Sequence, residues 1–321
     1  MNKKIGYGIA LLALLVAPQV VYPILMMKLL CFALFACAFN LLIGFTGLLS
    51  FGHAAFFGGA GYIAGWAMRD KGLTPEVGIL LGTLAGAAIG LVMGALAIRR
   101  QGIYFTMITL ALAQMLYFVF LQAKFTGGED GLQQVPRGKL LGVLDLGSDI
   151  TLYYVVLLIA VAGYALIVRT VHSPFGQVLK AVKENEPRAI SLGYDVDKYK
   201  LLAFVLSAGL SGLAGATKTL VLGFETLTDV HWTMSGLVVL MTLVGGLGTL
   251  VGPIVGAIII LVLENKLGEI GDFLARVTTV DWFHSLGESI TIVTGLIFII
   301  CVLAFRRGIV GEIGARLGKR A

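Results

Sequence analysis

The chain has 321 residues, of which 58% are hydrophobic and only 13% are charged, and its mean hydropathy is +0.95. A soluble domain carries about a quarter charged residues to cover its surface, so the composition excludes an ordinary soluble protein. The net charge of +6 does not indicate a nucleic-acid-binding protein, because the basic residues flank apolar segments instead of forming one stripe. The three cysteines lie inside apolar stretches and favour neither a disulfide framework nor a metal site.

Apolar segments long enough to cross about 30 Å of hydrocarbon recur along the whole chain. In chain order we predict spans at 5–22, 24–43, 48–68, 77–98, 103–123, 150–168 and 201–222, then a split segment at 234–265 and a last span at 288–305. External loops are expected at about 124–149, 223–233 and 267–287. Most Lys and Arg residues fall on the other side, which the positive-inside rule assigns to the cytoplasm together with both termini. The predicted fold class is therefore an all-α polytopic membrane protein, a single transmembrane domain over 1–321 with about nine to ten membrane elements. Residues 1–22 also fit a cleaved signal peptide, with Lys3 and Lys4 as its basic start.

Two of these segments are interrupted by glycine and polar residues. They are 40–65, which contains NLLIGFTGLLSFGHAAFF, and 245–257, which reads GGLGTLVGPIVGA. Irregular backbone at membrane depth is tolerated only where protein or a polar cavity satisfies it, and paired interruptions often mark the substrate site of a transporter. Tight helix packing alone explains the same pattern. The candidate translocation path consists of Gly47, Ser50, Gly52, His53, Gln114, Gly246, Gly248, Thr249 and Pro253. His53 also fits a hydrogen-bonded structural histidine, and Gln114 also fits a contact between helices.

The sequence offers no sign that this chain hydrolyses ATP or catalyses a reaction. Residues 212–219, GLAGATKT, approach a phosphate-binding loop but lack its second glycine and the preceding strand. Lys218 lies about one turn from the outer end of its predicted span, where we expect it to extend to the interface. We expect no fixed charge pair deep within the spans.

A polar segment at 170–200 is predicted on the cytoplasmic side. Ser173 followed by Pro174 predicts the start of a helix, which should end near Asn185–Glu186 because the residue before Pro187 avoids α geometry. Pro187 and Gly193 then bound a second helix of about two turns, too short to be stable alone. This helix must dock against something. A lipid surface is one possibility, but the mixed charges of the segment favour a protein partner.

These motifs together resemble the branched-chain amino acid permease family of ABC importers, in its LivM-type branch. The resemblance rests on the segment 40–62, on SPFGQ with AVKENEPRAISLG in the polar segment, and on GGLGTLVGPIVGA, and it covers nearly the whole chain. It implies a bacterial inner-membrane permease without a cofactor of its own. The implied partners are a second, LivH-like permease subunit, two cytoplasmic ATPase subunits that hold ATP and Mg²⁺, and a periplasmic binding protein that delivers leucine, isoleucine or valine.

By position, the resemblance assigns ATPase coupling to Glu184, Asn185, Glu186, Pro187, Arg188, Ala189 and Gly193. Arg188 departs from the family pattern, which commonly has alanine there, and so does Gly61 before Tyr62. The implied mechanism is alternating access, in which closure of the ATPases moves the short helix and rocks the two permease subunits.

Three other functions remain open at the level of sequence. The same architecture could carry urea or short-chain amides, because a related branch shares these motifs. An ion-coupled secondary transporter or channel should have intramembrane Asp or Glu residues, which the predicted spans essentially lack. An intramembrane enzyme would depend on His53 with Ser50, a pair that lacks an orienting acid.

Overall fold

The structure is a computed structural model that describes residues 12–19, 21–142, 144–278, 295–296, 299, 303 and 308–312. Helices dominate it. In chain order the elements are η1 (Ala17–Gln19), α2 (Pro23–Thr46), α3 (His53–Arg69), α4 (Pro75–Ala97), α5 (Ile103–Gln122), η2 (Lys124–Thr126), η3 (Gly128–Asp130), β1 (Lys139–Leu140), β2 (Leu144–Asp145), α6 (Asp149–His172), α7 (Pro174–Glu184), α8 (Glu186–Ser191), α9 (Val196–Leu222), α10 (Leu227–Val230), α11 (Trp232–Gly245) and α12 (Gly252–Thr278). The two short strands pair antiparallel, with Leu140 opposite Leu144.

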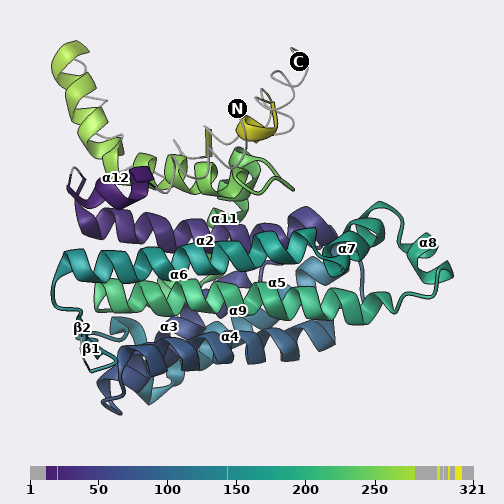
Figure 1. Ribbon diagram of the computed structural model, residues 1–321, viewed down its shortest axis with the longest axis horizontal. Coiled ribbons are helices and arrows are strands. Elements are labelled where there is room, and N and C mark those ends of the chain that lie inside the picture. The colour runs from purple at the N-terminus through teal and green to yellow at the C-terminus, as the bar shows by residue number, and fades with distance from the viewer. Residues whose placement is uncertain are drawn as a thin grey trace.

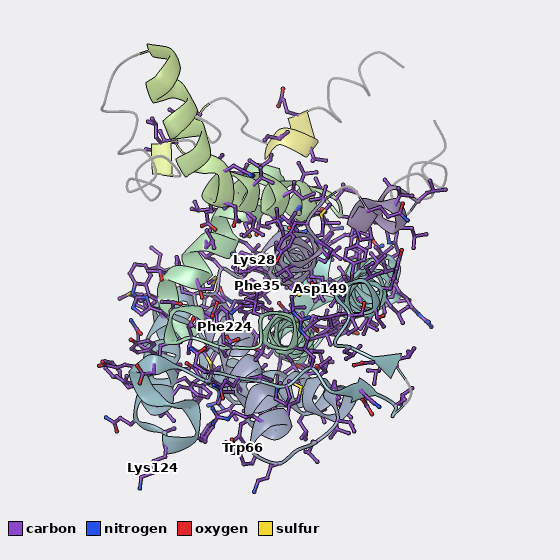
Figure 2. The ribbon with its side chains drawn as sticks, turned by 90° about the vertical axis from the view of Figure 1, so that its left-hand side faces the viewer. Lys28, Phe35, Trp66, Lys124, Asp149 and Phe224 are labelled. Atoms are coloured by element: carbon purple, nitrogen blue, oxygen red, sulfur yellow. The ribbon has the colours of Figure 1, made fainter. Side chains whose placement is uncertain are left out.

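The long helices form a bundle around α9, which packs against α2, α3 and α4 (Figure 1). Helices α2 and α6 run beside α9, with α3 and α4 on one side of this layer and α11 and α12 on the other. Helices α7 and α8 extend from one end of the bundle, and the β1–β2 hairpin lies at the opposite end. Figure 2 looks along the bundle from the hairpin end, with Trp66, Lys124, Asp149 and Phe224 toward the viewer.

Glycines allow the backbones of α4 and α9 to approach closely. A Cβ atom added at Gly90 would lie 2.3 Å from the Cβ of Ala208, and one added at Gly86 would lie 3.0 Å from the Cα of Gly212. Small residues at helix interfaces are typical of membrane proteins, where close packing drives helix association because lipid is as apolar as the side chains. Many of the chain's 43 glycines therefore serve packing.

Five helices in the described part of the chain are long and apolar enough to cross a membrane: α2, α4, α5, α6 and α9. The outward faces of α4 and α5 carry exposed large hydrophobic side chains, including Leu84, Val92, Met107 and Phe118. Such surfaces are stable in lipid and unfavourable in water. The predicted all-α polytopic membrane fold is confirmed.

Two predicted boundaries are wrong. Residues 47–52 are not helical, so α3 begins at His53 and not at 48, because Gly47 ends α2 with a left-handed backbone at φ +79°. Helix α12 continues to Thr278, so the predicted external loop at 267–287 begins as helix. The split of 234–265 into two helices is confirmed, with the break at 246–251. The predicted span at 288–305 lies mostly outside the described residues, as does the start of the one at 5–22.

Candidate functional site

The polar segment at 170–200 folds as two short helices. The backbone N–H of Gly176 donates to Ser173 Oγ, so Ser173 caps α7 as predicted. Asn185 ends α7 and also caps α8, because its Oδ1 accepts the backbone N–H of Arg188 at 3.1 Å. Gly193 follows α8 with φ +86°. The predicted pair of helices is confirmed, with α8 beginning at Glu186, one residue before Pro187.

Buried side chains and hydrogen bonds attach this pair of helices to the bundle. Val182 of α7, Ala189 of α8 and Val196 of α9 form a small buried cluster. Lys183 Nζ donates to the backbone oxygen of Gly44 at 2.7 Å, in the last turn of α2. A cation there is favourable, because the carbonyl oxygens at a helix C-terminus carry partial negative charge.

The outer face of α8 and of the residues after it is exposed and partly apolar. Ile190 is 57% exposed and Leu192 is 67% exposed, while Arg188 and Glu184 are also on the surface. A hydrogen bond from Lys198 holds the pKa of the nearby Asp195 below its usual range. Apolar side chains on a mixed-charge surface favour a protein partner.

The break before α3 is held by hydroxyl groups from two other helices. Thr106 Oγ1 of α5 donates to the Leu49 oxygen at 2.9 Å, and Thr109 Oγ1 accepts the Phe51 N–H at 3.2 Å. Ser235 Oγ of α11 donates to the Phe51 oxygen at 2.8 Å. The irregular backbone is thus satisfied within the protein, one of the two conditions under which it is tolerated in a membrane.

His53 is fully buried at the start of α3. Its Nε2 lies 2.9 Å from Ser207 Oγ, and that hydroxyl donates its own hydrogen to the Ala38 oxygen at 2.6 Å. Because Ser207 has only one hydrogen, it accepts from His53, so Nε2 carries the ring proton. The rings of Phe39 and Phe56 contact the imidazole edge to face. His53 therefore joins α3, α9 and α2, as a structural histidine does.

The break between α11 and α12 is held by Asn40 of α2. Asn40 Nδ2 donates to the Thr249 oxygen at 2.9 Å, and Asn40 Oδ1 accepts the Gly248 N–H at 3.0 Å. Gly246 and Gly248 both have positive φ, which glycine adopts without strain. The Asn40 amide therefore takes the place of two backbone hydrogen-bond partners, for the Gly248 N–H and the Thr249 oxygen. It also brings the two interrupted segments of the sequence together.

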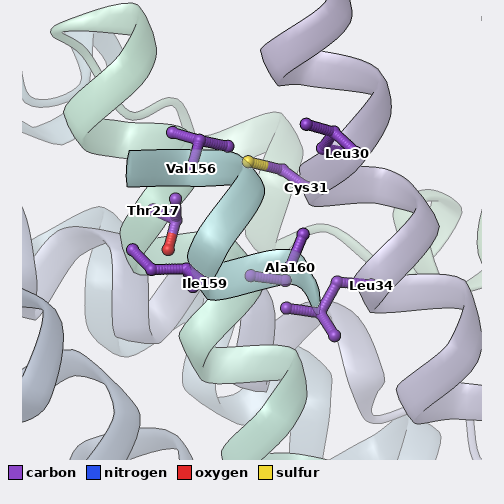
Figure 3. Close-up of a pocket in the computed structure, with 8 residues that line it drawn as sticks. Leu30, Cys31, Leu34, Val156, Ile159, Ala160 and Thr217 are labelled. Atoms are coloured by element: carbon purple, nitrogen blue, oxygen red, sulfur yellow. The ribbon is translucent and has the colours of Figure 1, made fainter. Parts of the chain in front are cut away.

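The predicted path residues lie mainly at these two breaks and are mostly enclosed. Ser50, Gly52, His53, Gly246 and Pro253 are buried, Gln114, Gly248 and Thr249 are half-buried, and Gly47 is exposed. A shallow depression between α2, α6 and α9 is lined by apolar side chains and Thr217 and has no room for a water molecule (Figure 3). Its lining offers no charged group for the two ends of a zwitterion.

The position of the Lys218 side chain differs from the prediction. Its side chain is only 4% exposed, and Nζ lies 2.5 Å from Asp229 Oδ2 and 3.4 Å from Glu225 Oε2, so it does not extend to the interface. The chain turns back at Gly223, with φ +74°, and carries both carboxylates inward. Glu225 is fixed there by paired backbone hydrogen bonds with Leu132. The expected extension of Lys218 to the interface is corrected: a buried charge cluster lies at the hairpin end of α9, and the region predicted as an external loop at 223–233 supplies its acids. Because this cluster lies at the end of a span, it does not contradict the expectation of no charge pair deep within the spans.

A family model described as "Branched-chain amino acid transport system / permease component" matches residues 23–303. The chain belongs to this family. It is 26% identical to the high-affinity branched-chain amino acid transport permease LivM of Salmonella typhimurium over 73% of this chain and 60% of LivM. The LivM of Escherichia coli matches to the same extent. The chain therefore spans about three fifths of the length of these relatives.

Permeases for other substrates also match. The autoinducer 2 import permease LsrC of Klebsiella pneumoniae is 31% identical over 58% of this chain and 53% of LsrC, and the ribose import permease RbsC of Haemophilus influenzae is 27% identical over 61% and 60%. Among solved structures, PsaBC from Streptococcus pneumoniae in complex with Fab aligns over 88% of this chain and 92% of that chain, with 18% identity and a TM-score of 0.39. The LivM, LsrC and RbsC relatives are all named as permease proteins of transport or import systems.

Proposed function

We propose that this chain is a permease subunit of an ABC importer that carries branched-chain amino acids across the bacterial inner membrane. The observation that carries this proposal is the α7–α8 pair in a chain of this family. It has an exposed apolar face at Ile190 and Leu192, and fixed contacts to the bundle behind it. A membrane protein that leaves such a face in water at one end provides a docking surface for a soluble partner. That partner is an ATPase subunit, and hydrolysis of ATP takes place there.

The remaining partners are a second permease subunit, a second ATPase subunit and a periplasmic binding protein. The breaks at 47–52 and 246–251 are closed by side chains of this chain, and the depression of Figure 3 is apolar and too small to hold a water molecule. These contacts support a path for a zwitterion that runs between this chain and the second permease. Gly47 and the half-buried Gln114, Gly248 and Thr249 are the predicted path residues that retain access to such an interface.

The substrate class rests on the family model, whose description names branched-chain amino acid transport, and on the similarity to the LivM permeases of Salmonella typhimurium and Escherichia coli. Urea or a short-chain amide is the second candidate substrate. The buried Lys218 cluster does not favour an ion-coupled transporter, because its carboxylates are occupied by a cation of the same chain.

The test is reconstitution of the complex with its co-expressed partners in liposomes. Leucine, isoleucine and valine should each compete for uptake and raise ATP hydrolysis when the binding protein is present, whereas urea and ribose should not. Uptake of urea or ribose in place of the amino acids would assign the other substrate. Recovery of this chain without an ATPase subunit after gentle solubilisation would contradict the importer function itself.

Substitutions in α8 and just after it test the docking surface separately. Ile190→Asp with Leu192→Asp should reduce co-purification of the ATPase subunit strongly, because two apolar side chains leave the interface. Leu141→Asp is the matched control, since Leu141 is 74% exposed at the opposite, hairpin end of the bundle. Equal ATPase recovery in both variants would remove α8 as the docking element.

A further inference from the structure

We infer that Glu186 and Lys200 form a positioning pair that fixes the orientation of α8 relative to α9, so that Glu186 acts inside the permease and does not contact the ATPase. This inference rests on the proposed function. It changes the role that the resemblance gives to Glu186, and it adds Lys200 and Gln101 to the coupling machinery.

Glu186 lies in the first turn of α8, and its carboxylate points toward the bundle. Lys200 Nζ lies 2.6 Å from Glu186 Oε1, and Gln101 Nε2 donates to the same oxygen at 2.9 Å. The Lys200 side chain is 4% exposed and that of Glu186 is 21% exposed. Three separate elements thus meet at one carboxylate oxygen: α8, the first turns of α9, and the connection between α4 and α5.

The pair is needed because α8 has only six residues. A helix that short has no independent stability in water, so its direction is set by what it is attached to. Ala189 supplies one apolar contact, but a single small side chain does not define an angle. The short charge-assisted bond from Lys200 supplies a second, directional attachment. Because the Ala189 contact and the Lys200 bond together fix the orientation of α8, a displacement of its outer face by a partner protein should also move α9.

The burial of Lys200 makes this arrangement specific. An ammonium group removed from water is stable only when a partner neutralises it, and Glu186 is the carboxylate that contacts it. A glutamate recruited to an ATPase surface would leave Lys200 buried without that partner. Glu184, two residues earlier, has its side chain on the surface, where it can face a partner protein.

The test compares single and double variants in the reconstituted complex by counting substrate molecules transported per ATP hydrolysed. Glu186→Gln and Lys200→Met should each lower this ratio by at least about threefold, while the amount of ATPase subunit bound stays unchanged. The double variant should be no worse than either single one, because both remove the same interaction. Lys200→Arg keeps the charge and should retain most of the ratio. Asp197→Asn, an exposed carboxylate of the same segment, is the matched control.

Three results would overturn the inference. Loss of the ATPase subunit from Glu186→Gln, with normal retention in Lys200→Met, would make Glu186 a contact of the ATPase. Additive losses in the double variant would show that the two residues act separately. A ratio equal to wild type in every variant, even with a lower unfolding temperature, would show that the pair is structural only. Failure of the proposed function looks different, since the wild-type complex itself would then transport no branched-chain amino acid.

Discussion

Replacing Lys218 with methionine should destabilise the protein more than any change at an exposed lysine. The substitution nearly preserves the side-chain volume but removes an ammonium that lies 2.5 Å from Asp229 and 3.4 Å from Glu225. At an effective dielectric constant of about 20, these attractions amount to about 7 and about 5 kcal/mol. Desolvation of the three groups offsets much of this, so the expected net loss is about 3–5 kcal/mol, typical of a buried ion pair that loses one partner.

The assay is thermal unfolding in detergent, followed by a thiol-reactive dye, because Cys31 and Cys37 are buried in the folded protein. The unfolding temperature of Lys218→Met should fall by roughly 10 °C. Adding Glu225→Gln and Asp229→Asn should restore most of the loss, since no unpaired charge then remains buried. Lys124→Met is the control, an exposed lysine at the same end of the bundle (Figure 2). An unfolding temperature within about 1 °C of wild type for Lys218→Met would refute the buried cluster.

Four further substitutions test the packing by the same unfolding measurement. Asn40→Ala leaves two backbone groups of the 246–251 break without their partner and should cost about 1–3 kcal/mol; no measurable loss would mean that Asn40 does not hold the break. Gly215→Ala places a methyl group 1.9 Å from a backbone oxygen and should also cost about 1–3 kcal/mol, whereas Gly236→Ala meets open space within a helix and should gain about 0.5–1 kcal/mol; equal effects would contradict this packing. Gly193→Ala should cost about 1 kcal/mol from its left-handed backbone, and a stabilised variant would show that α8 ends differently.

The features that the sequence predicts well are those that depend on neighbouring residues. The helix starts at Pro174 and Glu186 follow from a capping side chain and a proline within a few positions, and the end of α8 follows from Gly193. Membrane spans follow from the length of each apolar run. Such signals are local, so they can be recognised in a single amino-acid sequence.

The features that the sequence does not predict depend on contacts between distant segments. Asn40 and Thr249 are 209 positions apart, so no local pattern shows that one amide side chain satisfies the break. The hydrogen bond between His53 and Ser207 spans 154 positions. Lys218 does have a weak signal, because two acidic residues follow it within eleven positions, but only the reversal of the chain at Gly223 brings them to it.

The close contact between α4 and α9 has a mechanical consequence. At Gly86 and Gly90, almost no side chains separate the backbones of α4 and α9. Few side chains are therefore available to repack if one helix slides against the other. The two helices should therefore move together as one rigid body. Helix α9 has 27 residues, which corresponds to a length of about 40 Å. A small tilt imposed near Lys200 then becomes a larger lateral movement at Lys218, which lies at the opposite, hairpin end of α9.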